Sequence, residues 1–183
     1  ISKTGNTPSP CILPFREAVA VDLHLRRGVE IAPDRIVVLP GGKVTMFFAI
    51  LMFGEPGAEI LYPNPGFPIY ESVIQFSGAT AVPIPLLEER DFSFDAEAVL
   101  DQITPDTRLL ILNSPTNPTG GAMSRDEIDK LVTGLVDHSH VAVLSDEIYS
   151  RISTMDGNMF LCWATPRLQI GSFSWMVGAR PTQ

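Results

Sequence analysis

The apolar residues of this chain follow two periods that alternate along most of its length. Stretches of helical period predict helices, and the short continuous apolar runs between them predict buried strands. The predicted helices are Pro14–Gly28, Lys43–Phe53, Phe67–Phe76, Asp95–Ile103 and Ser124–Leu135. The predicted strands are Ile36–Leu39, Glu59–Tyr62, Thr80–Leu86, Leu109–Leu112 and Val141–Leu144. This alternation predicts an α/β fold, in which a mostly parallel sheet forms a three-layer unit with its helices.

Two local signals refine these elements. Pro83 and Pro85 interrupt the strand Thr80–Leu86, and a proline cannot donate to a sheet ladder, so this strand is expected at an edge. Ser124 precedes a helical pattern and Glu127 follows three residues later. This spacing predicts a capping box, in which the two side chains satisfy backbone N–H groups at the helix start.

Polar, turn-rich segments stand at the predicted strand ends. They read PGGK, YPNPGF, NSPTNPTGG and SDEIY. In open parallel sheets, ligands bind at the carboxyl ends of the strands. We therefore expect the chemistry of this protein at that edge of the sheet.

Composition narrows the possible functions. The 183 residues are 45% hydrophobic and 19% charged, as in an ordinary globular protein. The net charge of −8 argues against nucleic-acid binding. Cys11 and Cys162 lack the spacing of a metal site, so no metal is expected. No apolar run is long enough to span a bilayer and no signal peptide opens the chain, so we expect a cytoplasmic protein without membrane contact.

Two of the strand-end segments have the chemistry of a ligand site. Gly41, Gly42 and Lys43 lie between a predicted strand and a helix, where free backbone N–H groups bind phosphate. The alternative is a plain turn. Asn117 lies in a loop with two asparagine-centred turns, from which its amide can reach a ligand. The alternative is a rigid loop whose asparagines bond within the loop.

Three further residues complete the candidate set. Asp146 ends a buried strand, where a carboxylate is costly unless it meets a cation such as a protonated pyridine. Tyr149 lies three residues further on and can reach the same ligand. Phe67 follows another strand end and can stack on a flat ring. The alternatives are a capping role for Asp146 and core packing for Phe67.

Taken together, these motifs resemble those of the pyridoxal-phosphate-dependent aminotransferases of class I/II, which share the aspartate aminotransferase fold. The resemblance runs from about Asn6 to Ile152 and rests mainly on NSPTNPTG and SDEIY. It implies pyridoxal 5′-phosphate as the cofactor, with its phosphate bound at Gly42 and Lys43. It also implies that Phe67 stacks on the pyridine ring.

The resemblance assigns the remaining candidates to the polar atoms of the pyridine ring. Asp146 would pair with the ring nitrogen, while Asn117 and Tyr149 would bond the ring hydroxyl. The implied reaction transfers an amino group between an amino acid and a 2-oxo acid, in a homodimer. Two alternatives stay open: a non-catalytic cofactor-binding or regulatory homologue, and a lyase or decarboxylase on the same fold.

The sequence departs from the family pattern in its lysines. The family's Schiff-base lysine follows the SDEIY segment, whereas the lysines here are Lys3, Lys43 and Lys130. Asn6 also stands where the family usually has a tyrosine that reaches the partner subunit's phosphate. We therefore expect a truncated fragment that is inactive alone. Residues 1–152 would form part of the cofactor-binding large domain, and the C-terminal small domain would be absent.

The tail, residues 153–183, lacks the alternation of helical and strand patterns. Read in a shifted frame, the codons of Trp175, Met176 and Val177 must spell Asp-Gly, and the following codons allow WSKTYA. The resulting DGWSKTYA matches the family's lysine segment, with the lysine codon straddling Ala179 and Arg180. We therefore expect 153–183 to be a frameshifted, non-native tail that packs poorly.

Overall fold

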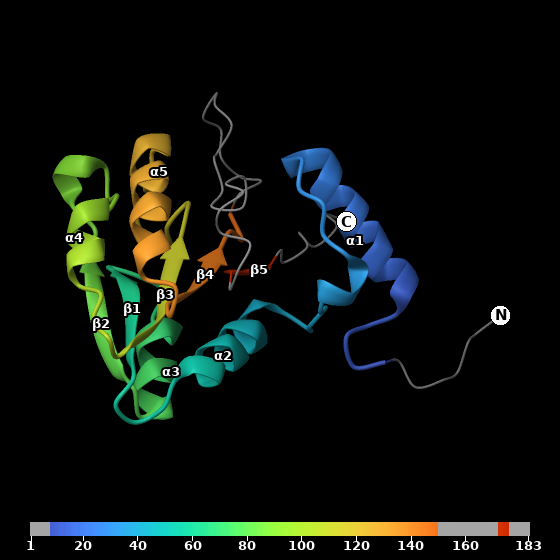
Figure 1. The fold of residues 1–183 in the computed structure, drawn as a ribbon, viewed down its shortest axis with the longest axis horizontal. Helices are drawn as coiled ribbons and strands as arrows, with labels where there is room; N and C mark the ends of the chain where they lie inside the picture. Colours follow the sequence, from blue (N-terminus) through green and yellow to red (C-terminus); the bar gives the residue numbers. More distant parts are fainter. Residues whose placement is uncertain (1–7, 150–171, 176–183) are drawn as a thin grey trace. The chain divides into compact units, whose positions relative to one another are not determined.

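A computed structural model describes residues 8–149 and 172–175 (Figure 1). Its α-helices are α1 (Leu13–Arg27), α2 (Gly42–Phe53), α3 (Ile69–Ser77), α4 (Ala96–Asp101) and α5 (Arg125–Gly134). Its strands are β1 (Glu59–Asn64), β2 (Thr80–Pro85), β3 (Thr107–Asn113), β4 (Ala142–Asp146) and β5 (Ser172–Trp175). Turns of 3-10 helix cover Pro33–Arg35, Glu88–Arg90 and Leu135–Asp137. The poor packing expected of the tail falls almost wholly outside the described residues.

The chain divides into two compact units, Ile1–Thr45 and Met46–Gln183. In the first unit, α1 ends where Gly28 takes a left-handed conformation (φ 66°) that a residue without Cβ adopts easily. The N–H of Gly28 donates to the carbonyl of His24 at 2.9 Å. The guanidinium of Arg16 joins α1 to the following turn by donating to the carbonyl of Pro33 at 3.0 Å. The helix predicted here is confirmed.

The strand predicted at Ile36–Leu39 is wrong. These residues belong to no strand of the sheet, although the backbone of Ile36 is extended, and the N–H of Val38 donates to the carbonyl of Pro10 at 3.4 Å. Ile36 is buried whereas Val37 is 61% exposed. A run of four apolar residues has a high strand propensity, but here the backbone finds its partner outside the sheet, and that context decides the conformation.

The second unit contains a five-stranded sheet with the order β2-β1-β3-β4-β5. All four strand pairings are parallel, which confirms the α/β prediction. The proline-containing β2 lies at the edge, as predicted from Pro83 and Pro85. The tail contributes β5 beside β4, a strand that the sequence pattern did not predict.

Helices cover both faces of this sheet, which gives the three layers (Figure 1). On one face, α4 and α5 pack on side chains that alternate with those of the other face: Leu61, Leu110, Leu112 and Val143. On the other face, α3 and the later turns of α2 pack on the intervening side chains: Ile60, Tyr62, Leu109, Ile111, Ala142 and Leu144. Within the described part of the chain, no helix has the length and apolarity needed to cross a membrane.

The start of α5 shows half of the predicted capping box. The Ser124 hydroxyl accepts a hydrogen bond from the N–H of Glu127 at 3.3 Å, as expected for an N-cap. The Glu127 carboxylate, however, accepts from the N–H of Ala96 at 2.7 Å, at the first residue of α4. The predicted reciprocal bond to Ser124 is therefore replaced by a link between two helices.

Candidate functional site

The candidate site begins where β3 and β4 end. Asn113 and Asp146 are register partners at the last position of this parallel pair, and both are buried. The Asn113 side-chain amide donates to the backbone carbonyl of Asp146 at 3.0 Å, and the N–H of Ser114 donates to the same carbonyl at 3.3 Å. The apolar runs of both strands thus end on polar residues that bond one another.

Asp146 has a buried carboxylate, with 6% of the residue exposed. Its Oδ2 accepts a hydrogen bond from the Tyr70 hydroxyl at 2.6 Å, and its Oδ1 accepts from the N–H of Ile148 at 3.3 Å. Burial raises the pKa of Asp146 above its ordinary value, while these two hydrogen bonds act in the opposite direction. A carboxylate held in this way is stabilised further by a cation.

The loop after β3 brings Asn117 towards the segment after β4. The N–H of Asn117 donates to the side-chain oxygen of Asn113 at 2.9 Å, which fixes the start of the loop. The Asn117 amide then donates to the Tyr149 hydroxyl at 3.2 Å. Both side chains are half-buried, so their polar ends converge at a place that solvent reaches. An amide N–H and a phenol O–H at this separation can both donate to one ligand oxygen.

Phe67 lies beside the same group of residues. Its half-buried ring meets the Tyr70 ring edge-on, with the centroids 6.1 Å apart and an interplanar angle of 83°. Tyr70 in turn bonds Asp146, so Tyr70 connects the Phe67 ring to the Asp146 carboxylate. Four of the six predicted residues therefore belong to one connected group: Phe67, Asn117, Asp146 and Tyr149.

Gly42 and Lys43 are the first two residues of α2, so the predicted helix start is confirmed, but no strand precedes it in the described part of the chain. Lys43 is exposed. Both belong to the first unit, Ile1–Thr45, whereas the other four candidates belong to the second. A shared site for all six residues is thus still a prediction.

Sequence reasoning missed two residues of this group. Tyr70 lies three residues after Phe67, within the predicted helix Phe67–Phe76, where that spacing would place the two side chains on one face. The observed α3 begins only at Ile69. Asn113 is the first asparagine of the NSPTNPTG motif, whose second asparagine was singled out. Their positions beside chosen residues were the available signals, but neither pattern reveals that their partner is Asp146.

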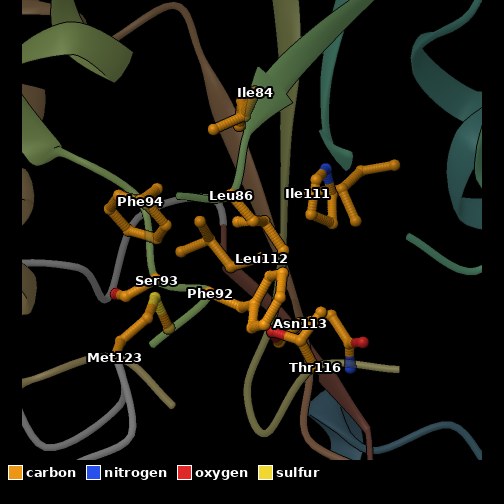
Figure 2. A pocket seen from close by; sticks show the side chains of 11 residues that line it. Ile84, Leu86, Phe92, Ser93, Phe94, Ile111, Leu112, Asn113, Thr116 and Met123 are labelled. Carbon is orange, nitrogen blue, oxygen red and sulfur yellow. The ribbon is translucent and has the colours of Figure 1, made fainter. Parts of the chain in front are cut away.

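A small pocket lies near the end of β3, lined mainly by apolar side chains with Asn113 and Thr116 among them (Figure 2). It is far too small for a cofactor. The candidate site is therefore the polar group around Asp146, and the pocket belongs to the packing beneath its loops. Within residues 8–149 and 172–175, no cluster of histidine, cysteine or acidic side chains has the arrangement of a metal site.

Comparison with known proteins decides the family. The family model for aminotransferase class I and II matches residues 3–174. The chain belongs to this family. Its class I and II relatives include a probable aspartate/prephenate aminotransferase of Aquifex aeolicus, 35% identical over 147 residues, and an aspartate/prephenate aminotransferase of Thermus thermophilus, 33% identical over 150 residues. The match covers 80% and 82% of this chain respectively.

Solved aminotransferase structures share the fold. The aspartate aminotransferase of Thermus thermophilus with maleate superposes with a TM-score of 0.88 at 29% identity, over 97% of this chain and 46% of that one. The aspartate aminotransferase of Rhizobium meliloti gives a TM-score of 0.86 over 42% of its chain. The chain spans 37% of the Aquifex relative and 39% of the Thermus relative, so it corresponds to well under half of a family member.

Proposed function

We propose that this chain is the cofactor-binding part of a pyridoxal-phosphate-dependent aminotransferase. The reaction of the whole protein would transfer an amino group between an amino acid and a 2-oxo acid. The observation that carries the proposal is Asp146: a carboxylate buried at the carboxyl end of a parallel sheet, held by two donors and in need of a cation. A homodimer and a cytoplasmic location, both expected from the sequence, belong to the same proposal.

The residues around Asp146 fit the cofactor by their donors and acceptors. The carboxylate would accept a hydrogen bond from the protonated pyridine nitrogen, and the neighbouring Asn117 amide and Tyr149 hydroxyl would donate to the ring oxygen. Phe67 would cover one face of the ring, and Gly42 with Lys43 would bind the phosphate. When bound, the protonated pyridine withdraws electrons from the carbon that bears the amino group.

In this arrangement, each residue of the chain has a separate task. Asp146 keeps a proton on the ring nitrogen because an ionised carboxylate stabilises the cationic form. Asn117 and Tyr149 stabilise negative charge on the ring oxygen. Asn113 holds Asp146 and Asn117 in place, since its side chain bonds the backbone of each.

A second candidate function is cofactor binding without catalysis. The observation that favours it is the distribution of lysines, because Lys3, Lys43 and Lys130 all precede Asp146 in the sequence. The family's Schiff-base lysine follows that position. We propose that the 183-residue chain binds the cofactor weakly and non-covalently, and is inactive alone because the tail 153–183 is frameshifted.

Equilibrium dialysis of the purified 183-residue chain against pyridoxal 5′-phosphate tests the proposal. Binding is expected to weaken by roughly 10- to 100-fold in Asp146→Asn, which removes a charge-assisted hydrogen bond. Asp137→Asn, at an exposed acid in the turn after α5, is the matched control and should bind like the unmodified chain. No binding by the unmodified chain, or equal binding by Asp146→Asn, would contradict the proposal.

A further inference from the structure

Tyr70 is the buried residue of the site region to which the proposed function gives no task. It lies on α3 in the core between this helix and the sheet, and none of its surface is exposed. Its hydroxyl donates to Oδ2 of Asp146 at 2.6 Å. Tyr70→Phe removes this hydroxyl alone and leaves the ring in place against Phe67.

The hydrogen bond between Tyr70 and Asp146 is short. A hydrogen bond from a hydroxyl to a carboxylate is short, about 2.5–2.7 Å, whereas bonds between neutral oxygens centre on about 2.7–2.8 Å. The bond between Tyr70 and Asp146 falls in the shorter range. Burial and the nearby carboxylate both raise the pKa of Tyr70, so the phenol keeps its proton and acts as the donor.

The other groups around Asp146 cannot replace this donor. Ile148 donates a backbone N–H to the second oxygen at 3.3 Å, a longer contact. The Asn113 side-chain amide donates to the backbone carbonyl of Asp146, not to its carboxylate. The Tyr149 hydroxyl accepts a hydrogen bond from the Asn117 amide at 3.2 Å and, among the described residues, makes no hydrogen bond to the Asp146 carboxylate. Glu147, which follows Asp146 directly, accepts a bond from the Ser145 hydroxyl and carries no proton to donate when ionised.

We propose that Tyr70 is a positioning residue that keeps Asp146 ionised and fixes its carboxylate for the pyridine nitrogen. The inference rests on the proposed function, because it assigns Asp146 the task described there. Without the hydroxyl, burial would still raise the pKa of Asp146, and one of the two hydrogen bonds that lower this pKa would be lost. The carboxyl would then hold its own proton at a higher pH and lose its ability to stabilise the pyridinium.

The first test uses the ligand-free 183-residue chain. Carboxyl carbon NMR follows the titration of Asp146, whose signal is identified by its absence in Asp146→Asn. Tyr70→Phe is expected to move the titration midpoint to higher pH, since a bond that favours the ionised form is lost. Tyr62→Phe is the matched control, because Tyr62 lies in the same core cluster and its hydroxyl has Glu71, not Asp146, as its partner. An unchanged midpoint in Tyr70→Phe would overturn the inference.

A measurement on the unmodified chain decides the matter if Tyr70→Phe does not fold. The hydroxyl-bearing carbon of Tyr70 should report the titration of Asp146, with the same midpoint, because the two groups share one proton bridge. Tyr62 should not report it. A Tyr70 carbon signal that does not shift when Asp146 titrates would equally overturn the inference.

The second test adds pyridoxal 5′-phosphate and follows its dissociation constant against pH. Tyr70→Phe is expected to bind about tenfold more weakly, as for the loss of one hydrogen bond to a charged group, with the loss growing as the pH falls. A purely structural role would weaken binding equally at all pH values, and that result would overturn the inference. If the unmodified chain does not bind, the proposed function fails while the ligand-free titration still decides the role of Tyr70.

Discussion

Gly121 is held closely by a neighbouring turn. A Cβ at this position would lie 2.5 Å from the carbonyl oxygen of Asp91 and 2.6 Å from that of Phe92. Its own carbonyl accepts from the N–H of Thr116 at 2.8 Å, so the loop that carries Asn117 closes on this residue. The absence of a side chain here lets the two backbones approach, and the position of Asn117 depends on that approach.

Gly121→Ala should therefore destabilise the chain. The added methyl meets backbone atoms, which have to move, and overpacking of this kind costs roughly 1–3 kcal/mol. Urea unfolding measures the loss. Gly134→Ala is the comparison: its Cβ would also lie too close to a neighbour, but that neighbour is the Leu100 side chain instead of backbone, and alanine favours the helix by about 1 kcal/mol. Equal losses in the two variants would show that the Asp91–Phe92 contact is not special.

Replacing Asp146, in contrast, is expected to stabilise the folded chain. Burial raises its pKa in the folded chain, so the folded state binds the proton more tightly than the unfolded state. The contribution of Asp146 to the free energy of unfolding accordingly falls as the pH rises through its folded pKa. Asp146→Asn should raise the melting temperature at pH 7, and the gain should shrink as the pH approaches 4.

Thermal unfolding of the two chains from pH 4 to pH 7 checks this prediction. Asp137→Asn, at an exposed acid, shows what the loss of one surface charge does. A lower melting temperature for Asp146→Asn at pH 7 would mean that its hydrogen bonds outweigh its burial. In either case, the measurement shows whether the carboxylate proposed to bind the cofactor stabilises or destabilises the folded chain.

At this scale, the sequence could identify residues that stand at strand ends, but not residues that reach them from another element. Asp146 ends β4 and Asn117 lies in the loop after β3, and these positions alone made them candidates. Tyr70 reaches Asp146 across 76 positions of sequence from a helix on one face of the sheet. That contact depends on how α3 packs, which no local pattern encodes.

At the scale of elements, Glu127 couples α5 to α4. Its carboxylate accepts from the N–H of Ala96 at 2.7 Å, and it also accepts from Lys130 at 3.0 Å. The bond from Ala96 is the main reason why the pKa of Glu127 lies below its ordinary value of 4.5. Ala96 is fully buried, so solvent water cannot replace Glu127 as the hydrogen-bond acceptor for its N–H.

Glu127→Ala should lower the free energy of unfolding by roughly 1–3 kcal/mol, because a buried donor loses its partner. Glu127→Gln should lose much less, since the side-chain oxygen still accepts. In the unmodified chain, the contribution of Glu127 is present above pH 4.5 and is lost as the pH falls through its lower folded pKa; Glu127→Gln should lack this acid dependence. Urea unfolding at pH 7 and pH 3.5 measures both effects, with the exposed Glu97→Ala as control.

The elements themselves were largely predictable, because burial on both faces gives each parallel strand a continuous apolar run. The exceptions follow from tertiary context. Ile36–Leu39 has the composition of a strand but bonds elsewhere. The segment Ser172–Trp175 does form β5, although the tail around it carries no element pattern that could have indicated a pairing with β4.

At the scale of the whole molecule, the parallel sheet gathers the candidate groups at one edge. The described part of the second unit places a carboxylate, an amide, a phenol and an aromatic ring within one connected group. Relatives are more than twice as long as this chain, and the family's Schiff-base lysine would lie beyond SDEIY. Cofactor binding and catalysis are therefore expected to separate in this chain.

The 183-residue chain should accordingly bind pyridoxal 5′-phosphate without a stable covalent bond. Lys130 is exposed on α5, where its ion pair with Glu127 raises its pKa and so favours the protonated amine. Lys43 begins α2, and the resemblance assigns it to the phosphate, at the far end of the cofactor from the aldehyde. Without a lysine after Tyr149, the family's proton-transferring group is also expected to be missing, and general acid–base catalysis typically contributes about 10²–10⁴-fold to the rate.

Borohydride reduction of the complex, followed by peptide mapping, measures any covalent bond, and an amino-transfer assay measures turnover. We expect no stoichiometric label on any lysine and no transfer from aspartate or alanine. The matched control is a chain whose tail is translated in the shifted frame, so that DGWSKTYA replaces the segment that begins at Trp175. This variant regains a lysine after Tyr149 and should be labelled there. Stoichiometric labelling of the unmodified chain with measurable turnover would contradict the expected inactivity.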